Sequence, residues 1–420
     1  MPRMTDEDLH ACVRGEIERA IQYTDEVISP KREAASRFYD GEKFGDEEEG
    51  RSQVISLDVR DTVNALMPSL MRIFFGPEHV VEYAPEGPED VELAKQQTDY
   101  VDYIVKRDNH GYRILHSVFK DALVRKCGII KFWWDNSYSG AETSEFSGLT
   151  EQDIGILLQE EENGGPEIEI ESEVDPETGL ISGKITRRYR RDRIRLAAVP
   201  PEEFIISPFA KSLEDARFVG HRAKVAASDL VAMGYDPEVV AGATTHNPLI
   251  DNVETTQRQY DRRYQDYDTS DPSQRPVLYI EGYLKVDFDG DGVSELRKIC
   301  TIGEDYRIVR NEAWDLVPFA EFCPDPEPHI FFGTSIADLT MDIQRVKSAV
   351  LRHMLDSLAQ SIHPRTVVTE GQVNIQDVLN TEVGAIIRAS APGMVAELTK
   401  DFVGREAFQV LDYYDAIREN

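Results

Sequence analysis

The sequence has few of the features that identify secreted or membrane proteins. Its four cysteines, Cys12, Cys127, Cys300 and Cys323, are widely scattered. None belongs to a C-x-x-C pair or lies at metal-binding spacing from a histidine, so we interpret them as reduced thiols of a protein made in the cytoplasm. The N-terminal segment has no apolar signal core, and no stretch reaches the roughly 18 apolar residues of a membrane-spanning helix. We therefore expect neither secretion nor a membrane partner.

Catalytic and nucleotide-binding signatures are missing as well. The chain contains no G-x-S-x-G, H-E-x-x-H, G-x-x-x-x-G-K-[ST] or G-x-G-x-x-G sequence. Its nine histidines are isolated, and none has a cysteine or aspartate at the spacing of a triad or a metal site. We predict that the protein is not an enzyme and that it uses no cofactor.

Basic residues are greatly outnumbered. The chain has 46 lysines and arginines against 78 aspartates and glutamates, a net charge of −32. Such a chain repels DNA unless its basic residues gather on one surface. An acidic wall would suit a channel that passes DNA without holding it, and surface solubility is the plainer alternative. The one basic cluster lies at residues 187–195, where we expect an acidic hairpin spanning residues 136–195 to pair its arginines with its glutamates rather than with phosphates.

A short acidic loop is similar to half of a calcium-binding loop. Asp287, Asp289 and Asp291, followed by a glycine, match the first, third, fifth and sixth positions of an EF-hand loop. Glu295 falls at the ninth position, but Lys298 stands where the bidentate glutamate belongs. The flanking segments are typical of strands rather than helices. We interpret the loop as a hairpin turn, with a weak calcium site at these three aspartates and Glu295 as the alternative.

The first 333 residues mix helical and strand patterns. Pro68 is expected to kink or split its helix, and at least one of the adjacent Trp133 and Trp134 is expected in a core or an interface. Residues 243–275 are polar and predict a flexible loop. We expect helices at residues 1–28 (capped by Thr5), 54–76, 89–108, 111–126 and 226–240, and strands at 79–85, 129–135, 277–286, 295–302 and 304–312.

One long amphipathic helix dominates the last hundred residues. Ser335 is a suitable N-cap, and Pro364 ends the helix. The helix would be about 40 Å long at 1.5 Å per residue. The apolar stripe predicts contact with another copy of the chain, and burial within its own domain is the alternative. The stripe consists of Ile336, Leu339, Ile343, Val346, Val350, Met354, Leu358 and Ile362.

Short segments that we interpret as strands follow this helix, at residues 365–371, 373–380, 384–390 and 392–398. A second amphipathic helix begins near Lys400, and the chain ends inside it. We therefore expect this sequence to be part of a longer chain.

The order of these parts resembles the portal proteins of tailed double-stranded DNA bacteriophages, particularly those of short-tailed phages. The most specific matches are "HIFFGTSIADLTMDIQRVKSAVLRHMLD" at 329–356, "NTEVGAIIRAS" at 380–390 and "NALMPSLMRIFFGPEHVVEYAPEGPEDVELAKQQTDYVDYIV" at 64–105. The resemblance runs from about residue 50 to the end of the chain.

The resemblance implies an α+β portal fold. Residues 1–333 would form an α/β wing, residues 334–362 a first stem helix, residues 363–399 a small β-containing clip, and residues 400–420 the start of a second stem helix. The family's tunnel loop and crown would lie beyond this sequence.

The resemblance also implies a structural function, as a head–tail connector of the virion. A closed ring of roughly twelve subunits would form a DNA channel at one capsid vertex, serve genome packaging and ejection, and contact the major capsid protein, the terminase large subunit and later the tail adaptor proteins. A calcium-binding structural or adhesion protein is the alternative. Subunit contacts would fall on Leu339, Ile343, Val346, Val350, Met354 and Leu358, and clip contacts on Arg365, Glu370, Gln372, Asn374 and Asp377.

Overall fold

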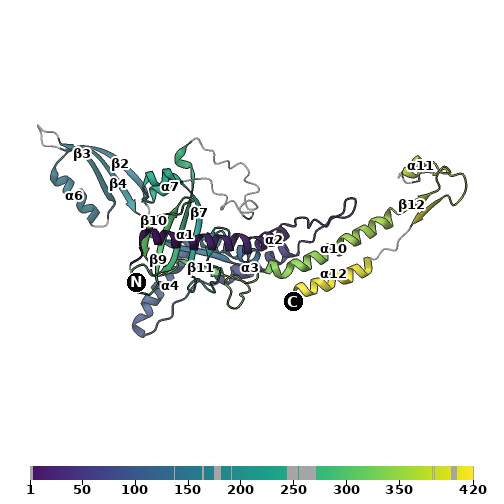
Figure 1. Ribbon diagram of the computed structural model, residues 1–420, viewed down its shortest axis with the longest axis horizontal. Coiled ribbons are helices and arrows are strands. Elements are labelled where there is room, and N and C mark those ends of the chain that lie inside the picture. The colour runs from purple at the N-terminus through teal and green to yellow at the C-terminus, as the bar shows by residue number, and fades with distance from the viewer. Residues whose placement is uncertain are drawn as a thin grey trace.

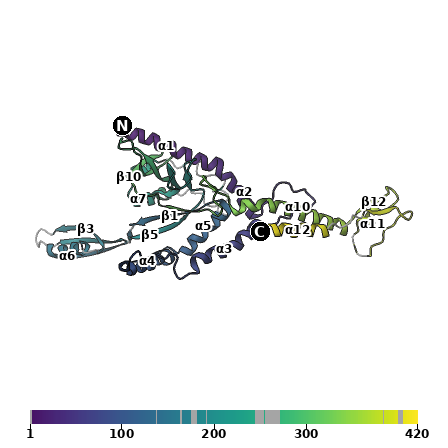
Figure 2. The ribbon, with the colours of Figure 1, turned by 90° about the horizontal axis from the view of Figure 1, so that it is seen from below.

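The computed structural model describes residues 3–419 except 137, 163–164, 175–180, 191, 244–253, 255–270, 381, 383 and 399–403. A mixed helix–sheet body carries a long helix, and a small module lies at the far end of that helix (Figure 1). A separate lobe projects from the opposite end of the body (Figure 2). Helices and antiparallel sheets both contribute, which confirms the α+β class.

The N-terminal helix is longer than predicted. Helix α1 (Asp6–Tyr23), a π-helical turn (Thr24–Ile28) and α2 (Ser29–Asp40) follow one another without a break. The side-chain oxygen of Thr5 accepts a hydrogen bond from the Asp8 amide, so the predicted cap is confirmed. The proline near the start of α2 comes just after the π-helical turn and does not end the rod.

Pro68 does not split its helix, so of the predicted kink or split only the kink stays a prediction. Helix α3 (Asp58–Phe75) is continuous through it. Met67 and Met71 on the two sides of the proline are buried against α5 (Gly111–Arg125), and this packing holds both halves in one helix.

The predicted strand at residues 79–85 is also absent. The amide of Val80 donates to Asp102 and the amide of Tyr83 donates to Thr98 Oγ1, each at 3.0 Å. The backbone therefore finds acceptors on side chains rather than on a neighbouring strand. The acceptors belong to helix α4 (Val91–Tyr103), which follows a 3-10 turn at Pro88–Asp90 and continues into a π-helical turn at Ile104–Asp108.

Two antiparallel sheets build the body. In the smaller sheet, β1 (Gly128–Asp135) lies between β5 (Arg193–Val199) and β11 (Phe319–Phe322). Trp133 and Trp134 on β1 are both exposed, so neither lies in the core of this chain, and the predicted interface role of one of them stays a prediction.

The larger sheet has five strands, and its apolar face is covered by α1. The strands on both sides of the aspartate loop are confirmed, as is the strand after them. The predicted helix near residue 230 is divided in two at Gly234, whose φ is 92°. The predicted flexible loop at 243–275 falls almost wholly outside the described residues. The elements, in chain order, are β6 (Phe204–Ile206), β7 (Phe218–Ala226), α7 (Ala227–Ala232), α8 (Pro237–Gly242), a 3-10 turn (Pro272–Gln274), β8 (Pro276–Val286), β9 (Glu295–Ile302) and β10 (Arg307–Ala313).

The projecting lobe is more elaborate than the predicted hairpin. Helix α6 (Glu151–Glu162) and three strands form it, in the order β2 (Tyr138–Leu149), β4 (Ile181–Arg190), β3 (Glu167–Val174). The expected pairing of charges is found at Arg188, whereas Arg193 and Arg195 pair instead with Asp135 on β1. Arg188 lies opposite Glu167 in the register and forms an ion pair with Glu169 at 2.7 Å.

The long helix α10 (Ile336–Ile362) has the predicted bounds. Beyond it lies a small module, residues 365–398, in which β12 (Arg365–Val368) pairs with β13 (Val395–Leu398). The segment 373–380, predicted as a strand, instead contains helix α11 (Ile375–Leu379), because Asn374 caps it. The segment 384–390, also predicted as a strand, makes only one bridge, between Val373 and Ala389. Helix α12 (Gly404–Glu419) then runs back along α10 toward the body (Figures 1 and 2).

Candidate subunit interface along the long helix

The start of α10 is fixed by a reciprocal cap. The Ser335 hydroxyl accepts a hydrogen bond from the Asp338 amide at 3.0 Å, and the Asp338 carboxylate accepts one from the Ser335 amide at 2.9 Å. Lys126, at the end of α5, forms an ion pair with the same carboxylate at 2.5 Å. These contacts attach the first turn of α10 to the body and determine the direction in which the helix leaves it.

The face of α10 that is buried in its own chain is mostly polar. Its buried residues are Ala337, Thr340, Gln344, Lys347, Ser348 and Arg352. An amphipathic helix ordinarily buries its apolar side. This helix does the reverse over its first five turns, so polar contacts supply much of its attachment to the body, beside the small apolar cluster of Ala35, Val59 and Ala337.

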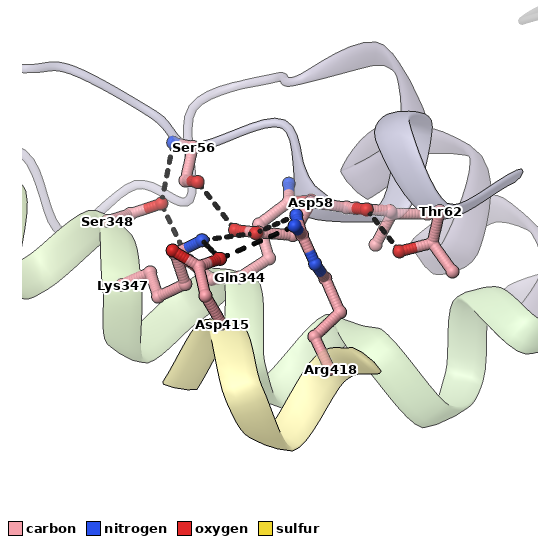
Figure 3. A network of polar contacts seen from close by, with 9 residues as sticks. Ser56, Asp58, Thr62, Gln344, Lys347, Ser348, Asp415 and Arg418 are labelled. Carbon is pink, nitrogen blue, oxygen red and sulfur yellow. Dashed lines mark hydrogen bonds and ion pairs between the residues drawn. The ribbon is translucent and has the colours of Figure 1, made fainter. Parts of the chain in front are cut away.

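The centre of these contacts is the carboxylate of Asp58, at the start of α3 (Figure 3). Asp58 is only 1% exposed. One of its oxygens accepts from Lys347 Nζ at 2.5 Å and from Arg418 at 2.9 Å, and the other accepts from the Ser56 hydroxyl at 2.5 Å. A buried carboxylate is tolerated only when it is paired in this way. Asp58 thereby joins α3 to both α10 and α12.

Backbone amides before and at the start of α3 are satisfied by side chains of α10. The Val59 amide donates to Gln344 Oε1 at 2.9 Å, and the Ser56 amide donates to Ser348 Oγ at 3.0 Å. Gln344 in turn donates to the Phe38 carbonyl at 2.9 Å. Each side chain bonds a specific backbone group, which determines the position of α10 along its axis.

The segment between α2 and α3, residues 41–57, lies along α10 and contacts it further out. Arg352 forms ion pairs with Asp46 at 2.7 Å and Glu47 at 2.5 Å, and its Nε donates to the Val54 carbonyl. The Ser52 amide donates to the Asp356 carboxylate at 2.7 Å.

Helix α12 is attached to α10 by the same group of charges. Asp415 accepts from Lys347 at 2.6 Å, and Arg418 bridges Asp415 and Asp58. Burial disfavours the charged form of Lys347, but its hydrogen bonds to Asp415 and Asp58 outweigh that effect and raise its pKa above the usual range. Of the apolar side chains described on α12, only Leu411 is buried. The contact between the two helices therefore depends strongly on ion pairs.

The predicted apolar stripe of α10 is largely unburied in its own chain, except that its first member, Ile336, packs against the cluster of α3 and α5. Leu339 is 55% exposed, and Val346 and Leu358 are also exposed. Ile343, Val350 and Met354 are half-buried. The structure thus leaves the stripe accessible to another molecule. The polar anchor on the other face was missed in the sequence, because Lys347 and Arg352 on an amphipathic helix are ordinarily solvated.

The five predicted clip contacts differ in availability. The side chains of Arg365, Glu370 and Gln372 are exposed. Asn374 caps α11, and the Asp377 carboxylate accepts two hydrogen bonds from Arg388, at 2.7 and 2.9 Å. These last two side chains therefore hold the module together.

The aspartate loop forms the turn between β8 and β9, so the hairpin interpretation is confirmed and an EF-hand helix pair is not present there. The carboxylates of Asp287, Asp289 and Asp291 lie within 4.8 Å of one another. Each also accepts backbone hydrogen bonds inside the turn. Glu295 is paired with Arg297 at 2.9 Å, away from the predicted ion position.

No helix among the described residues combines the length and the hydropathy of a membrane span.

In the comparison with protein families, the model described as phage SU10 portal protein matches residues 9–420, almost the whole chain. None of the curated proteins matches the sequence.

Proposed function

The chain belongs to the phage SU10 portal protein family, and we propose that it assembles into the ring at one capsid vertex through which the genome is packaged and ejected. Portal proteins are structural components of the virion that form oligomeric rings. A ring of roughly twelve subunits closed by one repeated contact is the form that we propose.

The exposed stripe of α10 carries this proposal. Its polar face is already bonded to its own subunit, so the free apolar face from Leu339 to Ile362 is available for a neighbour. Covering a large apolar side chain contributes about 1.5–3 kcal/mol when burial is complete. Several such side chains per contact, repeated around a ring, would make a stable assembly.

In this arrangement residues 1–333 form the wing, α10 and α12 form the stem, and residues 363–399 form the clip. The ring acts passively: it supplies a channel with two docking faces, and the packaging motor is a separate protein. We propose that the clip binds the terminase large subunit and later the tail adaptors, and that the wing contacts the major capsid protein. The net charge of −32 suits a channel that passes DNA without gripping it.

Electron microscopy of the purified protein tests the ring directly. Val350→Asp and Leu339→Asp are expected to abolish rings, because each places a charge in the apolar contact. Ala359→Asp is the matched control. At about 100° per residue, nine positions place exposed Ala359 on the opposite side of the helix from Val350. Normal rings from the first two variants, or loss of rings in the control, would contradict the stem assignment.

Docking at the clip is tested separately. Replacing the exposed Arg365, Glu370 and Gln372 with alanine is expected to weaken terminase binding in a pull-down while leaving rings intact. Loss of the rings in this variant would argue against the proposed division between stem and clip.

A further inference from the structure

The module at residues 365–398 has no interior of its own. None of its described residues is buried. Six of its large apolar side chains are exposed instead, with Ile386 at 82% and Leu379 at 73%. They are Val367, Ile375, Leu379, Ile386, Ile387 and Leu398.

Hydrogen bonds and one ion pair join the segments of this module. Strands β12 and β13 form four residue pairs, Arg388 pairs with Asp377, and the Ser390 amide donates to the Gln372 carbonyl at 2.9 Å. A two-stranded hairpin is marginal in water without a third strand or an apolar face packed against something else. A unit of fewer than about 40 residues also needs support from outside.

The exposed apolar surface of the module continues that of α10. Ile362, the last residue of the helix, is 61% exposed, and Val367 in β12 is also exposed. A neighbour that covers the stripe of α10 along its length reaches the module next. Within the module, the Asp377 carboxylate is already paired with Arg388.

We propose that the apolar side chains of this module bind the same module of the adjacent subunit, so that the module acquires its core only when the ring closes. The inference rests on the proposed ring. It assigns the apolar side chains to subunit–subunit contact and leaves Arg365, Glu370 and Gln372 for other partners.

Hydrogen exchange of the full chain tests this inference, with rings purified away from all other virion proteins and the ring-deficient Val350→Asp variant as the monomer. Amides of β12, β13 and α11 are expected to exchange at least about a hundredfold more slowly in the ring, while those of β8 are unchanged. Equal protection in both forms would overturn the inference, because the module would then be stable alone. Protection that appears only when a terminase or adaptor protein is added would assign the apolar surface to that partner instead.

A matched pair of double variants gives a second readout. Ile375→Asp/Leu379→Asp is expected to remove the protection gained in the ring, whereas Gln376→Asp/Asn380→Asp is not. Both pairs are four residues apart, and all four side chains are exposed in the single chain, so neither variant should unfold it. Equal loss in both variants would overturn the inference. A wild-type chain that stays monomeric in a mass measurement would refute the ring itself, whereas rings with an unprotected module would refute only the inference.

Discussion

Two buried carboxylates, one in the body and one at the root of α10, have nearly the same partners. Glu281 on β8 contacts Lys131 at 2.9 Å and Lys298 at 3.2 Å, and it accepts from the Tyr283 hydroxyl at 2.5 Å. Asp58 likewise has two cations and one hydroxyl.

The surroundings of the two carboxylates differ. Glu281 links the two sheets of the body, where large apolar clusters already hold the strands together. Asp58 lies where α3, α10 and α12 meet, and there the buried face of α10 is itself polar. The same chemistry is thus added to a large core in the body. At the root of α10 it stands beside a small apolar cluster, whose buried members are Ala35, Val59 and Ala337. Because α10 is attached largely through its polar face, its apolar side stays exposed.

The largest effect is expected from Asp58→Ala. The substitution leaves the buried Lys347 and the half-buried Arg418 without one of their carboxylates, and breaking a buried pair in this way costs about 3–5 kcal/mol. We expect a loss of that order in the free energy of unfolding, measured in urea, together with faster exchange of the α12 amides.

The matched control is Asp342→Ala, which removes an exposed carboxylate from α10 itself. It is expected to change stability by less than about 0.5 kcal/mol. Similar losses in both variants would show that Asp58 is not the anchor of the stem helices.

The second largest effect is expected in the pH dependence of folding stability, and it arises from Glu281. Burial alone would raise the pKa of this carboxyl, but Lys131 and Lys298 outweigh burial and lower it from 4.5 to about 2. Because the pKa is depressed in the folded state, its stabilisation is present above pH 4.5 and is lost as the pH falls toward 2. The difference is worth about 3 kcal/mol at 1.36 kcal/mol per pKa unit.

Glu281→Gln should therefore remove that part of the acid dependence when unfolding is followed from pH 5 to pH 2. Glu312→Gln on β10 is the control, because Glu312 pairs with Arg310 at a largely exposed site. If the two variants gave the same pH profile, the body carboxylate would contribute no more than a surface ion pair.

Sequence reasoning found α1, α3, α4 and α5, the aspartate hairpin and the long helix with its cap, because each depends on local periodicity or on a local hydrogen bond. It missed α6 and took the short, capped α11 for a strand. It failed where contacts between distant residues decide the outcome. Residues 79–85, predicted as a strand, instead find hydrogen-bond acceptors on α4. The role of Lys347 depends on Asp58, nearly three hundred residues earlier, and no local pattern marks that pair. The exposed stripe was recognised because periodicity alone defines it.

The smallest effect is expected from calcium added at the aspartate loop. Asp287, Asp289 and Asp291 lie close together at the surface, and Glu295 and Lys298 are committed to Arg297 and Glu281. A site without the bidentate ligand would bind calcium with a dissociation constant near 1 mM, which stabilises by only about 0.4 kcal/mol at that concentration. We therefore expect about 1 mM calcium to raise Tm by about a degree or less relative to chelator. A rise of many degrees that disappears in Asp289→Asn would instead support the calcium-dependent alternative. The asparagine Oδ1 can still accept from the Asp291 amide, so this variant removes the charge and keeps that hydrogen bond of the turn.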